Sequence, residues 1–146
     1  MQPASELSLP SFDYKIKDVG HKPAIWDVIR KKYIILTPEE WVRQHVVHWL
    51  LGAHKYPKAL FRIESGVRFH DLQKRTDVLV FDRAAAPFLL VECKATGVPL
   101  NAAVVAQVVR YNNTVKARYI LITNGLNHAV FNQNGEPLPG IPTFED

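Results

Sequence analysis

Two charged residues end an apolar stretch of this sequence, and a third begins the stretch before it. Glu92 and Lys94 follow the apolar run 88–91 and are two residues apart, so in a strand their side chains point to the same face. Asp77 immediately precedes the apolar run 78–81. Ionisable side chains at the end of an apolar central strand are costly to bury unless they pair or bind a metal ion. The spacing therefore indicates a paired or metal-binding cluster of Asp77, Glu92 and Lys94.

Two carboxylates and one ammonium group are suited to the hydrolysis of a phosphodiester. Carboxylate oxygens hold Mg²⁺ or Mn²⁺ in an oxygen shell that keeps water ligands free to react. The ion lowers the pKa of such a water and stabilises the charge that develops on the phosphate. Lys94 would orient the water or stabilise that charge, and it would offset the repulsion between Asp77 and Glu92.

Two helices and five strands are expected around this cluster. Thr37 is a good N-cap and Pro38 suits the first helical position, and apolar residues then recur every three or four positions from Val42 to Ala53. Strands are expected at about 60–69, 77–81 and 88–94, followed by a helix at about 102–115 that Asn101 would cap. Strands at 119–123 and about 128–131 complete the series.

This order predicts an α/β fold in which helices flank a mixed β-sheet. The run 88–94 is apolar on both faces until its last residues, as in a central strand covered on both sides. If 77–81 and 88–94 form an antiparallel hairpin, Asp77 lies beside Glu92 and Lys94. The helix at 102–115 would then cross over into the strand at 119–123.

A single domain is expected over residues 1–146, with an irregular N-terminal arm at 1–32, a core at 33–132 and an irregular tail at 133–146. The hydrophobic share of 47% and the charged share of 22% are those of an ordinary globular protein. The net charge of +4 permits a polyanionic partner without requiring one.

The cellular location is constrained by three negative features. No apolar run approaches the roughly 20 residues that cross a bilayer, so we expect no membrane span. The first six residues lack the pattern of a signal peptide. Cys93 is the single cysteine, which excludes an internal disulfide and a cysteine-built zinc site. A reducing, cytoplasmic setting is the resulting expectation.

The motifs around the charged cluster carry a family resemblance. Residues 75–77 (RTD) and 92–94 (ECK) resemble the bipartite motif of the PD-(D/E)XK nuclease superfamily. The segments PEEWVRQH at 38–45, VECKA at 91–95, QVVRYN at 107–112 and TNG at 123–125 further resemble the N-terminal nuclease domain of type I restriction enzyme R subunits. This resemblance covers about residues 37–126. It implies a restriction-endonuclease-like core and a Mg²⁺- or Mn²⁺-dependent endonuclease that cuts DNA in restriction or defence.

The resemblance also assigns roles to the residues of the cluster. Asp77 and Glu92 would be metal ligands, assisted by the backbone carbonyl of Cys93. Lys94 would orient the attacking water. The resemblance implies DNA as a partner, together with a motor or specificity protein, and cutting of both strands would call for a homodimer.

Two further positions complete the implied site. Glu40 would be the helix carboxylate that completes the metal site, with Glu39 as the alternative. Gln107 would help to position Lys94 or the substrate. The sequence departs from the family pattern at Thr76, where the motif's name has proline. It also has no helicase-like region, so we expect no DNA translocation by this chain alone.

Structural interpretations compete at each of these positions. Asp77 could cap a strand, and Glu92 and Lys94 could form a surface ion pair. Glu39 and Glu40 suit the positive end of a helix dipole, and Gln107 could be a polar residue on a helix edge. Arg43 could bind a phosphate or simply hold Glu40, and the second role is the one expected.

Other residues that could do chemistry have simpler interpretations. His45 and His48 could bind zinc as a pair, although no third ligand is near them in sequence. Cys93 is expected in the core rather than as a nucleophile. Trp26, Trp41 and Trp49 could stack on bases, Trp49 being the one expected in the core.

Two other functions fit less well. One is a catalytically silent nucleic-acid-binding module that works with a motor or other partner, which would show salt-sensitive binding without cleavage. The other is a structural or protein-interaction domain that binds neither metal nor nucleic acid.

Overall fold

A computed structural model describes residues 6–63, 68–69, 74–75 and 78–144 of the chain. Its helices are α1 (Pro38–Gly52) and α2 (Ala102–Val115), with a 3-10 turn, η1 (Lys58–Leu60). Its strands are β1 (Ile16–Val19), β2 (Lys22–Asp27), β3 (Lys32–Ile35), β4 (Phe61–Ile63), β5 (Arg68–Phe69), β6 (Lys74–Arg75), β7 (Val78–Phe81), β8 (Pro87–Cys93), β9 (Tyr119–Thr123), β10 (His128–Asn132) and β11 (Pro137–Leu138). Neither described helix has the length and apolar character needed to cross a membrane.

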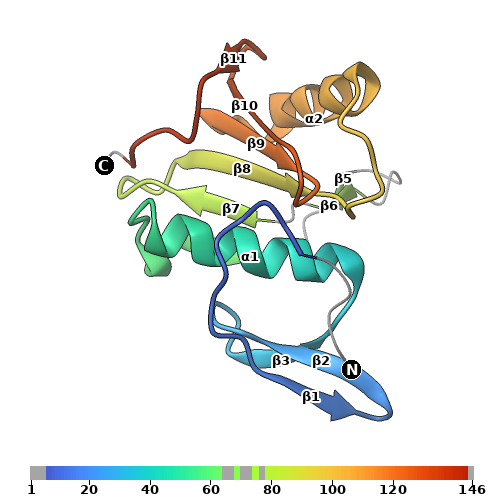
Figure 1. Cartoon of the computed structure of the whole chain (residues 1–146). Helices are drawn as coiled ribbons and strands as arrows, with labels where there is room; N and C mark the ends of the chain where they lie inside the picture. Colours follow the sequence, from blue (N-terminus) through green and yellow to red (C-terminus); the bar gives the residue numbers. More distant parts are fainter. Residues whose placement is uncertain (1–5, 64–67, 70–73, 76–77, 145–146) are drawn as a thin grey trace.

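A six-stranded sheet forms the centre of the molecule, in the order β11, β10, β9, β8, β7, β4 (Figure 1). Strand β8 pairs with β7 in antiparallel register, with Val78 opposite Val91. It pairs with β9 in parallel register, with Glu92 opposite Ile122. The other neighbours in this sheet are antiparallel. The predicted hairpin and the helical crossover into 119–123 are therefore confirmed over the described residues, and the sheet is mixed.

The two helices cover opposite faces of this sheet (Figure 1). Val46 of α1 shares a hydrophobic core with Val91 of β8, whereas Val108 of α2 belongs to a second core with Leu90. Adjacent residues of a strand point to opposite faces, which explains why Leu90 and Val91 belong to different cores. Strand β8 is thus covered on both sides, as its apolar sequence predicted.

Both helices begin where their capping residues predicted. The Thr37 hydroxyl accepts a hydrogen bond from Glu40 N at 3.0 Å, and Pro38 occupies the first turn of α1. The Asn101 side chain accepts a hydrogen bond from Val104 N at 2.9 Å at the start of α2. Each cap satisfies one of the amide groups that a helix N-terminus leaves without an intrahelical partner.

The expectation that residues 1–32 form an irregular arm was wrong for the second half of this range, where most residues are in strands. Strands β1, β2 and β3 form a three-stranded antiparallel sheet, which lies on the side of α1 away from the six-stranded sheet (Figure 1). Pro23 argues against a strand because proline donates no backbone hydrogen bond, yet it lies within β2 and its carbonyl accepts from Leu36 N at 2.8 Å. The tail was also expected to be irregular, but residues 137–138 form the short strand β11 beside β10.

Residues 6–15 run across the molecule before they enter β1. Ser8 N donates a 2.8 Å hydrogen bond to Gly125 O in the turn between β9 and β10. Farther along, the Phe12 ring stacks on His48 of α1, with ring centroids 4.1 Å apart and an interplanar angle of 12°. This segment therefore links the β9–β10 turn, helix α1 and the three-stranded sheet.

Candidate active site

Glu92 and Lys94 form an ion pair where the central strand β8 ends. The distance from Lys94 Nζ to Glu92 Oε2 is 3.2 Å. Glu92 is only 7% exposed, and the Lys94 side chain is about four-fifths buried. The two side chains are together because residues i and i+2 at a strand end share a face. The pair that the sequence predicted is therefore present, and burial makes its attraction stronger than that of a surface ion pair.

The turn after β9 supports this strand end. Lys94 N donates to Thr123 O at 2.8 Å, which extends the pairing of β8 and β9 past Cys93. In the same turn, Asn124 Nδ2 donates to Val98 O at 2.8 Å. This second bond anchors the loop that leaves the Glu92–Lys94 pair toward α2. The TNG segment thus has a positional role beside the pair, which its sequence alone did not specify.

Gly125 in this turn has a backbone conformation that favours glycine. Its φ is +88°, and a Cβ atom built there would lie 2.9 Å from Leu7 Cδ2 and 3.1 Å from Val42 Cγ2. A larger residue would therefore be strained by its backbone and would press on both the N-terminal segment and α1. Close packing of three segments at this point keeps the turn beside the end of β8.

Asp77 lies outside the residues that the structure describes. In the sequence it precedes Val78, whose Cα partner is Val91, and Val91 precedes Glu92. Among the described residues, no group of three His, Cys, Asp or Glu side chains lies close enough to hold a metal ion. Glu92 supplies a described carboxylate at the end of β8, and Asp77 stays the predicted second ligand.

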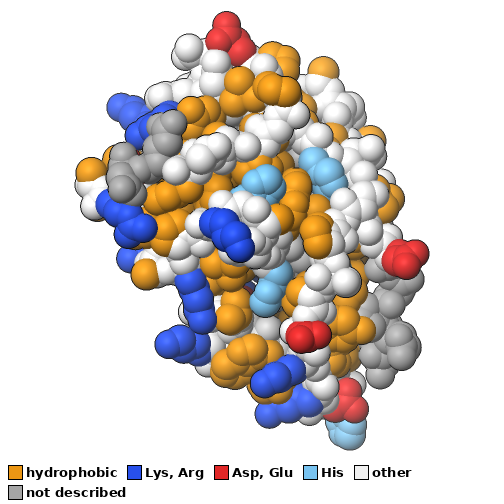
Figure 2. Space-filling model, turned by 60° about the vertical axis from the view of Figure 1, so that its left-hand side comes forward, with side chains coloured by type: hydrophobic (Ala, Val, Ile, Leu, Met, Phe, Trp, Pro, Cys, Tyr) orange, Lys and Arg blue, Asp and Glu red, His pale blue; other side chains and the backbone are white. Residues whose placement is uncertain are grey.

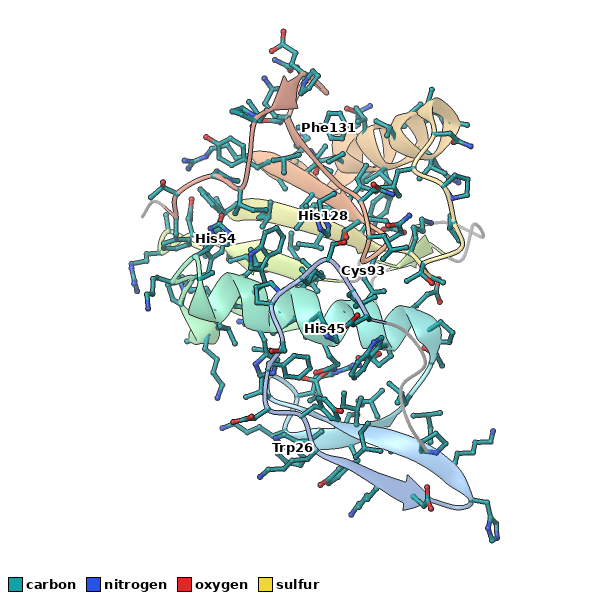
Figure 3. The ribbon with its side chains drawn as sticks, in the orientation of Figure 1. Trp26, His45, His54, Cys93, His128 and Phe131 are labelled. Carbon is teal, nitrogen blue, oxygen red and sulfur yellow. The ribbon has the colours of Figure 1, made fainter. Side chains whose placement is uncertain are left out.

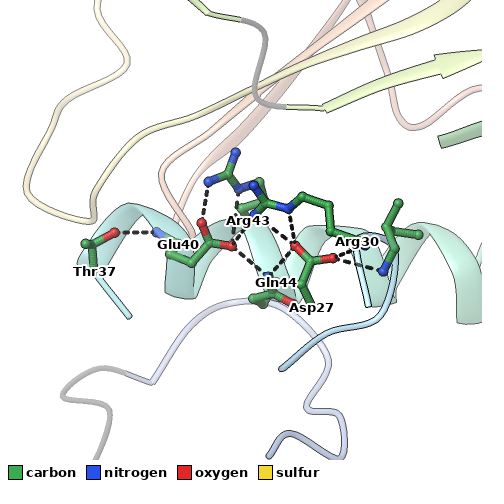
Figure 4. A network of polar contacts seen from close by, with 7 residues as sticks. Asp27, Arg30, Thr37, Glu40, Arg43 and Gln44 are labelled. Carbon is green, nitrogen blue, oxygen red and sulfur yellow. Dashed lines mark hydrogen bonds and ion pairs between the residues drawn. The ribbon is translucent and has the colours of Figure 1, made fainter. Parts of the chain in front are cut away.

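Glu40 lies in a buried polar network between α1 and the three-stranded sheet (Figure 4). It is 2% exposed, and Gln44 Nε2 donates to its Oε2 at 2.6 Å. Arg43 donates to both oxygens of the Glu40 carboxylate, the Nε–Oε2 distance being 3.3 Å. The structural role expected for Arg43 is therefore confirmed. No hydrogen bond or ion pair within the described part of the chain joins Glu40 to Glu92 or Lys94.

Asp27 is the second carboxylate of this network, and sequence reasoning missed it. Arg30 Nε and Nη2 each lie 2.9 Å from Asp27 Oδ2, and Gln44 Nε2 donates to the same oxygen at 3.2 Å. Burial alone would raise the pKa of Asp27. The backbone hydrogen bond and the charge of Arg30 outweigh it and hold the pKa below its ordinary value. The Gln44 amide thus bridges Asp27 of β2 and Glu40 of α1, which fixes the three-stranded sheet to the helix.

Gln107 and Glu39 are both exposed. Gln107 is on the solvent side of α2, and no described hydrogen bond or ion pair connects it to Glu92 or Lys94. Glu39 is exposed in the first turn of α1, where it fits the positive end of the helix dipole. Of the two helix carboxylates, Glu40 is the one that the fold buries.

The expected interpretation of Cys93 is confirmed, and a zinc site at the two histidines of α1 gains no support. Cys93 is buried in the core that contains α1 (Figure 3). His45 Nδ1 lies 2.8 Å from Trp41 O, and the ring of His48 stacks on Phe12. Burial lowers the pKa of both histidines. Both are therefore packed in an aromatic cluster as neutral rings near pH 7.

The comparison with protein families identifies the chain. The family model for the type I restriction enzyme R protein N terminus matches residues 38–142. The chain belongs to this family. The matched region includes α1, the six-stranded sheet strands from β4 to β11 and α2, and therefore both Glu40 and the Glu92–Lys94 pair. The three-stranded sheet at residues 16–35 lies before it. Comparison with curated proteins gives no match. The family relates the chain to restriction enzymes.

Proposed function

We propose that this chain is a metal-dependent endonuclease of the restriction or defence type, with DNA as its substrate and a restriction-endonuclease-like core. The observation that carries the proposal is the buried Glu92–Lys94 pair at the end of a central strand, inside the region that the restriction-enzyme family model matches. A carboxylate and an ammonium group beside it are the groups that metal-assisted phosphodiester hydrolysis uses.

Asp77 and Glu92 are the proposed ligands of Mg²⁺ or Mn²⁺, with the Cys93 carbonyl as a third oxygen donor. Asp77 is chosen because it immediately precedes the residue that pairs with Val91 in β8. An all-oxygen donor set suits these hard cations. A bound ion would lower the pKa of a water ligand and stabilise charge on the scissile phosphate. Lys94 would offset part of the repulsion between the two carboxylates.

Lys94 is the proposed positioning group for the attacking water. Its ammonium lies 3.2 Å from Glu92 Oε2, so it would be near a water ligand of an ion held by that carboxylate. Its backbone is fixed by the hydrogen bond to Thr123 O, so movement of the ammonium is confined to the side chain. Gln107 is proposed to contact the substrate from α2, which agrees with its exposure.

Glu40 is proposed as a further metal ligand. Its polar network suggests a competing role, in which Glu40 joins α1 to β2, and an experiment can distinguish the two roles. In the Glu40→Gln variant the side chain keeps its shape but loses its charge. If Glu40 is a ligand, the Mn²⁺ affinity of the Glu40→Gln variant is at least tenfold lower than that of the parent. If Glu40 only joins α1 to β2, Mn²⁺ affinity is retained while the free energy of unfolding falls.

Nicking of supercoiled plasmid DNA tests the proposal. The parent should convert the plasmid to open-circular or linear forms with Mg²⁺ or Mn²⁺ and not in EDTA. Asp77→Asn and Glu92→Gln should lose at least 100-fold in rate, whereas Glu136→Gln, which changes an exposed carboxylate between β10 and β11, should cut like the parent. Equal rates in all four proteins would refute the proposal. DNA binding without cleavage under either cation would instead support a silent binding module that acts with a motor or specificity partner. Cuts in both strands would suggest a homodimer.

A further inference from the structure

The three-stranded sheet has one face toward α1 and one face away from it. Asp27 reaches Gln44 of α1, and Ile25, two residues earlier in β2, points the same way and is fully buried. The intervening residue, Trp26, therefore belongs to the other face, which we call the outer face. Figure 1 shows this sheet as the layer beyond α1, and Figure 3 places Trp26 within it.

The strand register assigns the remaining residues of the outer face. Residues directly opposite one another in antiparallel strands share a face, and residues two apart in a strand do so as well. Tyr33 is opposite Trp26, Lys17 and Ile35 are both opposite Ala24, and Val19 is opposite Lys22. The outer face therefore presents Lys17, Val19, Lys22, Trp26, Tyr33 and Ile35. Just before β1, Lys15 O accepts a 2.9 Å hydrogen bond from Trp26 N, so exposed Lys15 adjoins this face.

Aromatic rings and lysine ammonium groups lie together on the outer face. The rings of Trp26 and Tyr33 are 5.3 Å apart, edge to face, and both residues are half-buried. Lys17 Nζ lies 4.3 Å from the centroid of the Tyr33 ring. Two large apolar side chains, Val19 at 44% and Ile35 at 40%, are among the most exposed of their type in the described chain. The face thus combines positive charge with rings and exposed apolar surface.

The carboxylates of these strands lie on the opposite face. Asp18 is one residue from Lys17 in β1, so it points the other way, and Asp27 is bound by Arg30 and Gln44 beneath the sheet. The outer face therefore has lysines without acidic neighbours in its own strands. Figure 2 shows Lys or Arg side chains next to hydrophobic ones at the lower end of the molecule, with Asp or Glu side chains toward one side of it.

We propose that the outer face of the β1–β2–β3 sheet binds single-stranded nucleic acid. The phosphates would contact Lys15, Lys17 and Lys22, and unstacked bases would pack on Trp26 and Tyr33. Lysine ammonium groups attract phosphates, and base–aromatic stacking contributes to binding of any sequence because every base has a π-face. The contact of Lys17 with the Tyr33 ring is weak at an exposed site, so a phosphate can draw the ammonium away.

Charge and ring geometry favour this ligand over the other occupants. A second copy of the same face would bring lysines against lysines, which is repulsive. A duplex keeps its bases stacked on one another and offers aromatic side chains few base faces. The surface also lies outside the segment 38–142 that the family model matches. The outer face and the proposed nuclease site would both bind nucleic acid, but they are separate surfaces. Either proposal can therefore fail without the other.

Fluorescence anisotropy of a labelled oligonucleotide, measured in EDTA to prevent cleavage, tests the inference. The probes are a 20-nucleotide oligo-dT and a 20-base-pair duplex, each titrated with the full chain. The parent should bind oligo-dT more tightly than the duplex. Lys17→Gln combined with Lys22→Gln should weaken oligo-dT binding at least fivefold. Each lost phosphate contact lowers the slope of log K against log salt by about 0.7, so the slope should become shallower by about 1.4.

Trp26→Leu should weaken oligo-dT binding about tenfold, as expected for one lost base–aromatic contact. Lys116→Gln is the matched control, because Lys116 is an exposed lysine at the end of α2 on the far side of the six-stranded sheet. Since Trp26→Leu could disturb the sheet, the decisive comparison uses the variant that combines Lys17→Gln and Lys22→Gln. Both lysine side chains are exposed, so the circular dichroism spectrum of this variant should match that of the parent.

Several results would overturn the inference. These are no binding of oligo-dT by the parent, equal binding by the lysine variant and Lys116→Gln, tighter binding of the duplex than of oligo-dT, or a change of oligomeric state as the main effect of the variants. The nuclease proposal fails separately. Loss of plasmid nicking in Asp77→Asn or Glu92→Gln concerns the active site, whereas weaker oligo-dT binding in EDTA by the lysine variant than by Lys116→Gln concerns the outer face.

Discussion

Asp27→Asn should destabilise the fold strongly, because it removes the negative charge on which the network between β2 and α1 depends. In the parent, Arg30 makes two contacts of 2.9 Å with Asp27 Oδ2, and Gln44 donates to the same oxygen at 3.2 Å. Asparagine can still accept from the amides of Ile29 and Arg30 through one oxygen. Its amide nitrogen, however, would face the donors of Arg30 and Gln44.

The magnitude follows from these contacts. Hydrogen bonds to a charged group contribute about 1.5–3 kcal/mol each, and removal of one partner of a buried ion pair costs about 3–5 kcal/mol. Arg30 is partly exposed, with 19% side-chain accessibility, so solvent screens part of the pair and the lower end of this range applies. We therefore expect a loss of about 3 kcal/mol, equivalent to a fall of roughly 10 °C in Tm for a domain of this size.

Urea denaturation followed by circular dichroism measures this loss. With an m-value of about 1.5 kcal/mol/M, the midpoint should fall by about 2 M with little change in m. Asp18→Asn is the matched control, since it removes an exposed carboxylate from the same sheet and should change stability by less than about 0.5 kcal/mol. A loss below 1 kcal/mol in Asp27→Asn, or equal losses in the two variants, would show that the network does not hold the sheet to α1.

The same residue should make stability depend on pH in acid. The folded pKa of Asp27 is depressed, so its contribution is fully present above the unfolded value near 3.9 and is lost as the pH falls through the lower folded value. When the pH is lowered below about 4, the free energy of unfolding should therefore fall less in Asp27→Asn than in the parent. Parallel acid profiles for the two proteins would contradict this assignment.

Two further predictions follow from other sites. Burial lowers the pKa of His48 in the folded protein, so its contribution to stability should be full above the unfolded pKa of about 6.5 and be lost as the pH drops through the folded pKa. His48→Phe keeps the stack on Phe12, so its free energy of unfolding should fall less than that of the parent between pH 7.5 and 5.5. An equal fall in the two proteins would contradict the assignment. Gly125→Ala should lower the free energy of unfolding, measured in urea, by about 1–3 kcal/mol, because Gly125 has a positive φ and its Cβ would contact Leu7 and Val42. Gly97→Ala should change this free energy little, since there is open space at its Cβ. Equal effects of the two substitutions would refute the packing argument.

Local sequence signals predicted most of the elements of the matched region. Thr37 and Asn101 cap α1 and α2 as expected, because a capping side chain bonds to an amide only three residues away. The apolar run in β8 predicted a central strand, and the hairpin with β7 followed from the short connection between them. These features depend on neighbours in sequence, so the sequence specifies them directly.

Features that depend on distant partners were missed. β2 contains Pro23 and exposes a lysine, so it lacks the alternation of an ordinary strand and gains its stability from packing on α1. Asp27 and Gln44 are 17 residues apart, and their hydrogen bond requires the sheet to be folded against the helix. Similarly, Asn124 bonds to Val98 across 26 residues. Local pattern contains no information on such contacts.

The candidate site was predicted in part for the same reason. Glu92 and Lys94 are two apart on one strand, and the structure brings them together as strand geometry requires. Glu40 was selected by its place in the family motif, whereas its described side-chain contacts are with Arg43 and Gln44 of the same helix and with Arg30, which follows the missed strand β2. Asp77 lies outside the described residues and remains a prediction.

The most direct test of the proposed chemistry is the rate of Mn²⁺-dependent nicking of supercoiled plasmid by the parent and by Lys94→Met. Methionine keeps most of the length of the lysine side chain without its charge and leaves Glu92 and Asp77 in place, so the variant should still bind Mn²⁺ in a calorimetric titration. The account predicts nicking by the parent and a loss of at least 100-fold in Lys94→Met at saturating Mn²⁺. Equal nicking by the two proteins, or no nicking by the parent at any Mn²⁺ concentration, would contradict it.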